Sequence, residues 1–223
     1  MKTPATDAMS RQAGGYDRRW ARYLDATLGP AVEALGGVDG RVVDLGAGTG
    51  ELARRLRLSG FGGQVVGLDP SAAMLGVAAR KGVANDRLIK GSADRIPLAD
   101  ATADACVSAS ALHAVRDAPR LLAEARRVLR PGGRLVLVDW SADYVSVRIR
   151  ARLLRRFDPE FRSIYGLSDV CKLCESSGLR VGDRRSYRVG PTWGIYLVVA
   201  SSQHAGGPGL PSGAVPAIIP RTN

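Results

Sequence analysis

The sequence has 223 residues and a mass of 23.6 kDa, enough for one domain with short extensions or for two small domains. Hydrophobic residues make up 45% of the chain and charged residues 24%, a composition that excludes wholesale disorder. The 32 basic residues exceed the 21 acidic residues by 11. Such a charge attracts nucleic acid, anionic lipid or acidic small molecules, but the basic residues are dispersed, which favours a compositional bias.

The chain carries no targeting or membrane signal that we recognise. No apolar run approaches the roughly 18 residues of a membrane-spanning helix, and residues 1–15 lack the apolar core of a secretory signal. Three cysteines, Cys106, Cys171 and Cys174, are too few for a disulfide scaffold and favour the cytoplasm. Cys171 and Cys174 have no second ligand pair, so no metal site is predicted. Residues 1–15 and the Gly/Pro-rich tail 203–223 are expected to be flexible and disordered, respectively.

Hydrophobic periodicity predicts an N-terminal helix and then alternating strands and helices. Apolar residues recur at three- and four-residue steps from residue 16 to residue 35. The predicted strands are 41–45, 64–68, 87–90, 104–108 and 134–139, and the predicted helices between them are 51–58, 71–80 and 119–129. This alternation is typical of βαβ units, with helices on both faces of a mainly parallel sheet.

The pattern changes after residue 140. A basic amphipathic helix is predicted over 146–157 and a second helix over 168–177. Strands at about 179–187 and 194–201 are joined by a short connection, which predicts an antiparallel hairpin at the sheet edge. The predicted fold class is therefore α/β: a Rossmann-like, doubly wound, mainly parallel seven-stranded sheet with an antiparallel C-terminal edge hairpin, contained in residues 16–202.

The most informative segment is the glycine-rich turn after the first strand. Gly46, Gly48 and Gly50 allow a tight turn and a close approach of ligand to backbone, and the helix that follows presents free N–H groups. The dehydrogenase fingerprint requires a third glycine at position 51, where this chain has Glu51. The segment therefore predicts a nucleotide-type ligand but disfavours an NAD-dependent dehydrogenase.

Two carboxylates flank this turn. Asp44 precedes the first glycine by two residues, which suits a cationic ligand better than a pyrophosphate. Asp69 ends the second strand at the position where a carboxylate binds both hydroxyls of a ribose. We expect Asp69 to lie at a solvent-facing strand end.

Six motifs follow one another along the chain: Tyr16-Asp17, 43–50 (VDLGAGTG), 67–75 (GLDPSAAML), 91–98 (GSADRIPL), 110–113 (SALH) and 127–135 (RVLRPGGRL). In this order they resemble the class I S-adenosylmethionine-dependent methyltransferases. The closest likeness is to the methyltransferase type 11 family, which includes the ubiquinone/menaquinone-biosynthesis C-methyltransferases. The resemblance covers roughly residues 16–200.

The resemblance implies S-adenosylmethionine (SAM) as cofactor and S-adenosylhomocysteine as product. It assigns the methionine end to Asp44, Gly46, Ala47, Gly48, Thr49 and Gly50; the ribose to Asp69; the adenine to Pro70, Ser71, Met74, Ser92, Ala93 and Asp94; and the sulfonium region to Tyr16, Ala109 and Ser110. Ser92 departs from the family, whose members often carry an acid there. Asp94 either substitutes for that acid or faces solvent.

Methyl transfer from a sulfonium is an in-line displacement that needs correct positioning and, for some acceptors, a base. Two side chains that follow predicted strands are candidates for the base. His113 has a suitable intrinsic pKa, and Asp139 ends a strand at the crevice. Each also has a structural interpretation: His113 as a packing or capping residue, and Asp139 as the cap of the next turn.

Aromatic residues define the expected acceptor site. Residues 16–37 are expected to form a lid helix, and residues 141–178 a substrate-pocket insertion. The predicted substrate pocket comprises Trp20, Tyr23, His113, Trp140, Tyr144 and Trp193, although ordinary packing is the alternative for Trp20 and Tyr23. The arginines of Arg148–Arg156 either contact a membrane surface, anchor an acidic substrate or form a solvated helix face.

The sequence thus predicts a SAM-dependent methyltransferase that acts on a small, aromatic or lipophilic acceptor by C- or O-methylation. Quinone biosynthesis and secondary-metabolite biosynthesis are the candidate settings. Two alternatives stay open: an RNA-directed methyltransferase, although the chain has no dedicated nucleic-acid module, and a non-catalytic SAM-binding protein. The sequence predicts no oligomeric state.

Overall fold

The computed structural model describes residues 13–82, 87–157 and 162–203, with the backbone alone at Phe157, and every structural statement below concerns these residues. Most of the predicted flexible N-terminus and nearly all of the predicted tail lie outside them. Residues 13–15 are described, and Ala13–Gly15 form a 3-10 turn, η1.

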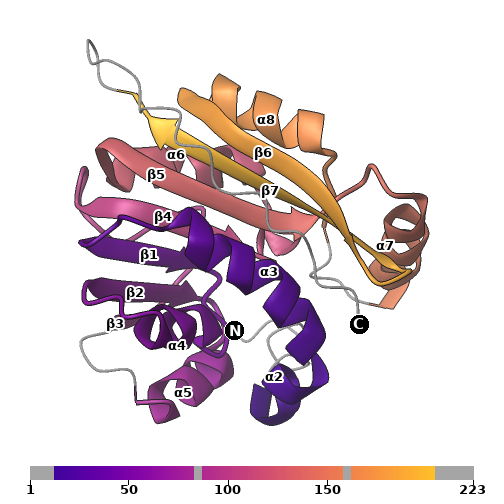
Figure 1. Cartoon of the computed structure of the whole chain (residues 1–223), viewed down its shortest axis with the longest axis horizontal. Coiled ribbons are helices and arrows are strands. Elements are labelled where there is room, and N and C mark those ends of the chain that lie inside the picture. The colour runs from indigo at the N-terminus through magenta and orange to yellow at the C-terminus, as the bar shows by residue number, and fades with distance from the viewer. Residues whose placement is uncertain (1–12, 83–86, 158–161, 204–223) are drawn as a thin grey trace.

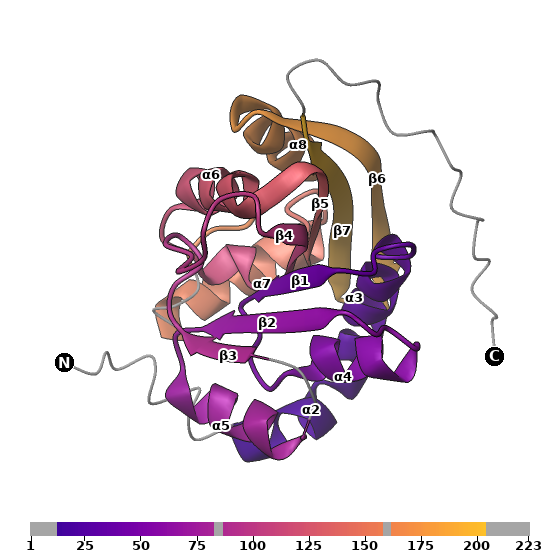
Figure 2. The same ribbon diagram turned by 90° about the vertical axis from the view of Figure 1, so that its left-hand side faces the viewer.

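A seven-stranded sheet forms the centre of the molecule (Figure 1). Its strands, in chain order, are β1 (Arg41–Leu45), β2 (Gln64–Asp69), β3 (Arg87–Lys90), β4 (Ala103–Ala109), β5 (Leu129–Trp140), β6 (Leu179–Val189) and β7 (Trp193–Ser202). The spatial order is β3-β2-β1-β4-β5-β7-β6, and β7 pairs antiparallel with both β5 and β6. The other pairings are parallel. The predicted mainly parallel sheet with an antiparallel edge hairpin is confirmed, and Figure 2 shows its strong twist from β2 to β6.

The helices are α2 (Tyr16–Arg19), α3 (Ala21–Ala34), α4 (Glu51–Leu58), α5 (Ala72–Arg80), α6 (Ala118–Val128), α7 (Val145–Phe157) and α8 (Leu167–Ser176), with a 3-10 turn η2 (Leu112–Ala114) after β4. Most bounds lie within one or two residues of the predicted ones. The Ser71 side chain accepts a hydrogen bond from the Met74 N–H and so caps α5, as the sequence predicts.

Two local predictions need correction. The expected continuous helix over residues 16–37 is broken at Trp20, whose φ of −107° and ψ of 13° leave helical geometry between α2 and α3. The break lets α2 turn toward the glycine-rich loop while Trp20 packs against Trp193 of β7. The strand predicted over 134–139 starts five residues earlier, because β4 pairs with β5 on both sides of an irregularity in register.

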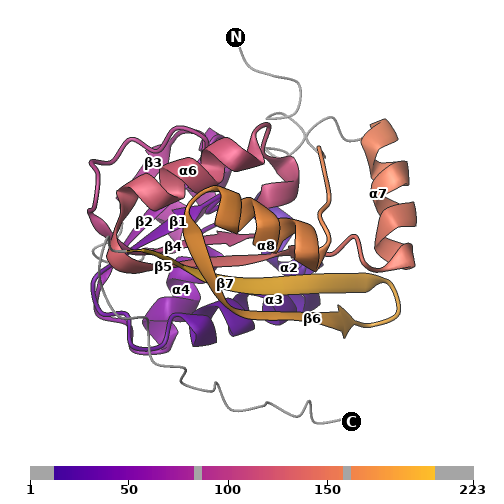
Figure 3. The same ribbon diagram turned by 90° about the horizontal axis from the view of Figure 1, so that it is seen from above.

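Side chains on both faces of the sheet are buried, as expected for parallel strands covered by helices. Leu135 and Leu137 of β5 pack in the core beneath α6 and α8, whereas Val136 and Val138 pack in the core beneath α3, α4 and α7. Figure 3 shows α6 and α8 on one face of the sheet and α3 and α4 on the other.

The segment after β5 divides into two parts. Helix α8 buries Val170, Cys171 and Cys174 in the core with α6 and β6, so it covers the sheet. Helix α7 stands beside the carboxyl ends of the strands (Figure 3). Of the expected substrate-pocket insertion, only α7 and its flanking loops lie at the edge where ligands bind in open α/β sheets.

Candidate active site

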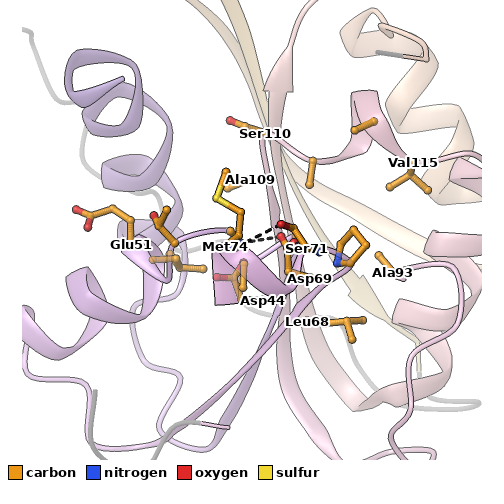
Figure 4. A pocket seen from close by; sticks show the side chains of 18 of the residues that line it. Asp44, Glu51, Leu68, Asp69, Ser71, Met74, Ala93, Ala109, Ser110 and Val115 are labelled. Atoms are coloured by element: carbon orange, nitrogen blue, oxygen red, sulfur yellow. Dashed lines mark hydrogen bonds between the residues drawn. The ribbon is translucent and has the colours of Figure 1, made fainter. Parts of the chain in front are cut away.

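A cavity of about 470 Å³ opens at the carboxyl ends of β1, β2 and β4 (Figure 4). All but two of the predicted cofactor residues line it: Tyr16, Asp44, Gly46, Ala47, Gly48, Thr49, Asp69, Pro70, Ser71, Met74, Ser92, Ala93, Ala109 and Ser110. Figure 4 shows Asp44, Asp69, Ser71 and Met74 grouped together, with Ala93 and Val115 to one side and Glu51 to the other. The sheet therefore brings motifs far apart in sequence to one site.

The two exceptions have structural reasons. Gly50 lines a smaller neighbouring cavity of about 270 Å³. It is the N-cap residue of α4, and its φ of +73° lies in the left-handed region. A Cβ there would lie 2.9 Å from the Cβ of Ala78, so this glycine lets α4 and α5 pack closely. Asp94 is absent from the wall of the larger cavity, and its carbonyl accepts a hydrogen bond of 3.0 Å from Arg120 Nε. The structure does not place Asp94 as the substitute acid.

The glycine-rich loop is fixed to its neighbours by backbone contacts. The N–H groups of Gly46 and Ala47 both donate to the carbonyl of Leu68, at 2.8 and 3.0 Å. Gly46 has a φ of +86°, and a Cβ at this position would lie 2.4 Å from the Cβ of Ala111. Because no other residue fits this conformation and this contact, the loop requires glycine here.

Asp69 is buried, and this corrects the expectation of a solvent-facing strand end. The residue is 8% exposed, and its two carboxylate oxygens accept hydrogen bonds of 2.8 Å from the N–H groups of Gly48 and Ser71. Burial raises its pKa, although these two hydrogen bonds oppose the shift. Asp69 therefore ties the glycine-rich loop to the start of α5 besides facing the cavity.

Asp44 lies deeper in the same wall and is 3% exposed. Burial, and next the charge of Asp69, raise the pKa of Asp44 to about 7. A carboxyl group with this pKa is partly protonated near neutrality, and a cation in the cavity would favour its ionised form. The site therefore carries a charge that responds to a positively charged ligand.

Helix α2 is attached to the loop by an ionic network. Thr49 Oγ1 donates a hydrogen bond of 2.5 Å to Asp17, and Lys81 Nζ lies 2.6 Å from Asp17 and 3.3 Å from Glu51. Burial raises the pKa of Glu51, but hydrogen bonds and charges from Arg54 and Lys81 outweigh it and lower the pKa to about 2. Glu51, which stands where the dehydrogenase fingerprint has a glycine, is thus an ionised residue that helps to hold Lys81 beside α2.

Tyr16 projects from the same helix into the cavity wall. Burial, followed by the nearby charges of Asp17, Asp69 and Asp139, raises its pKa to about 12. Tyr16 is therefore a neutral hydrogen-bonding group at physiological pH. Lys81 could not be assigned to this network from the sequence, because its place at the end of α5 meets Asp17 and Glu51 only in the folded chain.

His113 and Asp139 form a hydrogen-bonded pair. His113 Nδ1 lies 2.8 Å from Asp139 Oδ1, and the backbone N–H of His113 donates to Asp139 Oδ2 at 3.0 Å. Asp139 is 1% exposed and also accepts the N–H of Trp140, so the carboxylate acts only as acceptor. It holds the imidazole as the tautomer with its proton on Nδ1. Two candidates that the sequence offered as alternatives therefore form one unit.

The predicted substrate-pocket aromatics pack on one another instead of lining the cavity. The ring centroid of Trp193 lies 4.8 Å from that of Trp140, 4.9 Å from that of Tyr23 and 5.8 Å from that of Trp20. The imidazole of His113 stacks on Trp140 at 5.4 Å. None of these five residues is part of the cavity wall. The four aromatic residues pack between α3, β5 and β7, whereas the His113 side chain keeps 19% of its surface exposed. Trp20 and Tyr23 thus pack against neighbouring rings, which was the alternative to a place in the substrate pocket.

Tyr144, also predicted for the substrate pocket, lies outside the cavity wall and packs under the guanidinium of Arg188, 4.9 Å from its ring centroid. The wall includes further residues that the sequence analysis did not assign to the site: Leu24, Leu28, Glu51, Leu52, Leu68, Ala111, Ala114, Val115, Arg116 and Arg162. Leu24 and Leu28 follow the helical repeat, which indicated a buried face but not its partner. Arg162 is brought in by tertiary contact, its backbone N–H donating to the His113 carbonyl at 2.8 Å.

Comparison with known proteins identifies the central part of the chain. The model of a protein family described as "Methyltransferase domain" matches residues 43–137, from β1 to β5. Residues 43–137 form a methyltransferase domain. It resembles class I, SAM-dependent methyltransferases such as the ubiquinone/menaquinone C-methyltransferases.

Two curated relatives indicate the range of the similarity. The ubiquinone/menaquinone biosynthesis C-methyltransferase UbiE of Caulobacter sp. strain K31 is 35% identical over 145 residues, 60% of this chain and 54% of the relative. The malonyl-[acyl-carrier protein] O-methyltransferase of Pectobacterium atrosepticum is 39% identical over 134 residues, 59% of this chain and 51% of the relative. The chain thus spans about half the length of these two relatives.

A solved structure has the same fold as this chain. The putative methyltransferase of Haloferax volcanii, in complex with the Trm112 methyltransferase activator, superposes with a TM-score of 0.78 at 22% identity. The match covers 88% of this chain and 98% of that chain. These comparisons overrule the dehydrogenase interpretation, in agreement with Glu51. Within residues 13–82, 87–157 and 162–203, no His, Cys, Asp and Glu side chains gather as a metal site, and no helix is long and apolar enough to cross a bilayer.

Proposed function

We propose that this protein transfers a methyl group from SAM to a small aromatic or lipophilic acceptor, on carbon or oxygen, with His113 as proton acceptor. The observation that carries the proposal is the short distance along the chain between the two parts of the site. Ser110 and Ala111 line the cofactor cavity, and His113, paired with Asp139, follows two residues later. The domain similarity supports the cofactor, and the pair supports acid–base chemistry.

The cavity fits the cofactor in its chemistry. The buried carboxyl of Asp44 suits a cationic methionine end, and the glycine-rich loop leaves room because Gly46 has no side chain. Met74 is 1% exposed and gives an apolar wall that suits an adenine ring. We assign Asp69 to the ribose and Tyr16 to the sulfonium region.

When bound, SAM supplies a methyl group activated by a positively charged sulfur. The chain's own residues then have two tasks: to hold the acceptor in line, and to remove its proton. Asp139 holds the proton of His113 on Nδ1, so the basic lone pair lies on Nε2. An acceptor hydroxyl, or a ring carbon after attack, loses its proton to Nε2, and Asp139 stabilises the imidazolium that results.

The acceptor class rests on the cavity wall and on the relatives. Leu24, Leu28 and Val115 give the cavity an apolar side, which supports an aromatic or lipophilic acceptor. The relatives named for quinone C-methylation and for O-methylation support both reaction types. We therefore propose quinone or secondary-metabolite biosynthesis as the setting. The three free, buried cysteines support the cytoplasm as location.

Calorimetric titration with SAM, S-adenosylhomocysteine and NAD tests the cofactor first. We expect micromolar binding of the first two and none of NAD. Formation of S-adenosylhomocysteine with 1,4-naphthohydroquinone or catechol, compared between the natural protein and His113→Ala, then tests the reaction. Binding of NAD would contradict the proposal. Binding of SAM with no turnover on either acceptor class would support the non-catalytic alternative.

A further inference from the structure

Helix α7 exposes a stripe of large apolar side chains. Val145, Ile149 and Leu153 are 58%, 56% and 60% exposed, and their four-residue spacing places them on one face of the helix. Among the described residues, only Leu58 and Leu88 are other large apolar side chains with comparable exposure, and they stand singly. Isolated exposed leucines are ordinary, whereas a stripe of this kind marks an interaction surface.

The stripe is bordered by positive charge only. Arg148, Arg152, Arg155 and Arg156 are exposed, and α7 contains no acidic residue. At 100° per residue, all four arginines lie within a quarter turn of Val145, and Arg148 and Arg155 lie on the side away from Ile149 and Leu153. The outer face of α7 therefore combines apolar and cationic side chains, as in helices that lie in the interface of anionic membranes.

The opposite face of α7 is already packed. Val147 and Ala151 are buried in the core beneath α3 and α4. On the same inner side, the guanidinium of Arg150 lies 4.0 Å from the ring centroid of Trp193 and 5.9 Å from that of Trp140. These contacts hold the helix with its apolar stripe outward, and the stripe does not pack against the described core.

We propose that α7 docks this protein on the surface of an anionic lipid bilayer. Val145, Ile149 and Leu153 enter the boundary between headgroups and acyl chains, and the bordering arginines contact the lipid phosphates. The charge complementarity selects a bilayer over an apolar protein groove. Because α7 stands at the carboxyl edge of the sheet (Figure 3), the docked helix places the cavity mouth near the bilayer. This inference goes beyond methyl transfer and does not depend on it.

Co-sedimentation of the full chain with vesicles tests the proposal. We expect binding to vesicles of phosphatidylcholine and phosphatidylglycerol (7:3), and binding that is weaker by ~10-fold or more on phosphatidylcholine alone. The variant Ile149→Ser/Leu153→Ser keeps the charge and is expected to weaken binding by about tenfold. Leu58→Ser is its matched control, because Leu58 is 73% exposed on α4, and we expect it to bind as the natural protein does.

A second pair of variants tests the arginines. Arg148→Gln/Arg152→Gln/Arg155→Gln is expected to weaken binding by roughly 100-fold, at about fivefold per charge. Arg87→Gln, on the opposite sheet edge, is the control that should bind normally. Thermal unfolding and SAM titration of every variant report whether the fold is intact.

Three results would overturn the proposal. The first is that the natural protein stays in the supernatant of the anionic vesicles. The second is that Ile149→Ser/Leu153→Ser binds as well as Leu58→Ser while the triple glutamine variant loses binding, which would make the face a general polyanion site. The third is a dimer in sedimentation analysis that Ile149→Ser/Leu153→Ser abolishes, which would assign the stripe to a second copy of the chain.

Discussion

Asp44 and Asp69 lie near the carboxyl ends of adjacent parallel strands, and the charge of Asp69 adds to the burial that raises the pKa of Asp44 to about 7. Asp69 is held by two backbone N–H groups, whereas among the hydrogen bonds described none is made by the Asp44 carboxyl. The two carboxyl groups therefore differ: Asp69 fixes the loop, whereas Asp44 is the group whose protonation a bound cation would change.

This difference predicts a pH dependence of cofactor binding. If a cation at the cavity favours ionised Asp44, binding releases a proton below pH 7, and affinity for SAM falls by up to about tenfold per pH unit as the pH is lowered. Asp44→Asn should bind SAM ~10- to 100-fold more weakly at pH 8 and lose most of that pH dependence. Calorimetry between pH 6 and pH 8 measures both. An unchanged profile in the variant would remove Asp44 from the cofactor site.

The same substitution should stabilise the free protein. The pKa of Asp44 rises from 3.8 to about 7 on folding, so between these values only the folded state holds the proton. Stability from this group is thus present below pH 4 and is lost as the pH rises through 7. Asp44→Asn should gain roughly 1–3 kcal/mol at pH 8 and little at pH 4. Urea unfolding at both values measures this, with the exposed Asp183→Asn as control.

The pair of His113 and Asp139 predicts a loss of turnover without a loss of cofactor. His113→Asn and Asp139→Asn should each lower turnover by about 10²- to 10⁴-fold, the second because an amide no longer fixes the imidazole tautomer. Affinity for SAM should stay within about twofold, since neither residue lines the cavity. Full turnover in both variants would make the pair a packing element.

The network around Lys81 predicts a role in holding α2. Lys81→Met removes the cation between Asp17 and Glu51 and should weaken SAM binding by about three- to tenfold. Amide exchange of residues 16–19 should become faster, and mass spectrometry measures it. Arg55→Met is the control, because Arg55 contacts Glu51 but not Asp17. Equal effects of the two variants would show that Glu51, and not the attachment of α2, matters.

The hydrogen bond from Ser110 to Tyr23 predicts a link between α3 and the end of β4. Ser110 has a φ of +59°, and its hydroxyl donates to the Tyr23 phenol oxygen at 2.8 Å. Tyr23→Phe should lower stability by about 1 kcal/mol and also reduce SAM affinity, since Ser110 lines the cavity. Tyr187→Phe loses a comparable bond to the Ala26 carbonyl and should affect stability alone. Thermal unfolding and calorimetry compare the two.

Much of the fold is encoded locally, which is why the sequence predicts it. Strands β1, β2 and β4 are short apolar runs between glycine and polar turns, and their alternation with amphipathic helices specifies a parallel sheet. The glycine-rich loop is likewise a local device, and the structure places most of its residues on one cavity wall. The break at Trp20 was not predicted; Trp20 packs there against Trp193, a residue far along the chain whose position the local sequence does not indicate.

The sequence predicted individual site residues, but it did not predict which of them contact one another. Both His113 and Asp139 could be assigned to carboxyl ends of strands, but their hydrogen bond depends on the register of β4 and β5 and on the turn η2 between them. The aromatic side chains were expected to face a ligand. They instead fill the space where α3, β5 and β7 meet, a three-way contact that no single segment encodes.

The position of β7 bears on how the protein emerges during synthesis. β7 lies between β5 and β6, so β5 keeps one bare edge until residues 193–202 have left the ribosome. Until then, the nascent chain displays unpaired backbone groups beside the apolar side chains of Leu135 and Leu137. If translation stops before Trp193, the glycine-rich loop has already been synthesised but the edge of β5 is still unpaired. An exposed strand edge of this kind is prone to aggregation and is a target for chaperones.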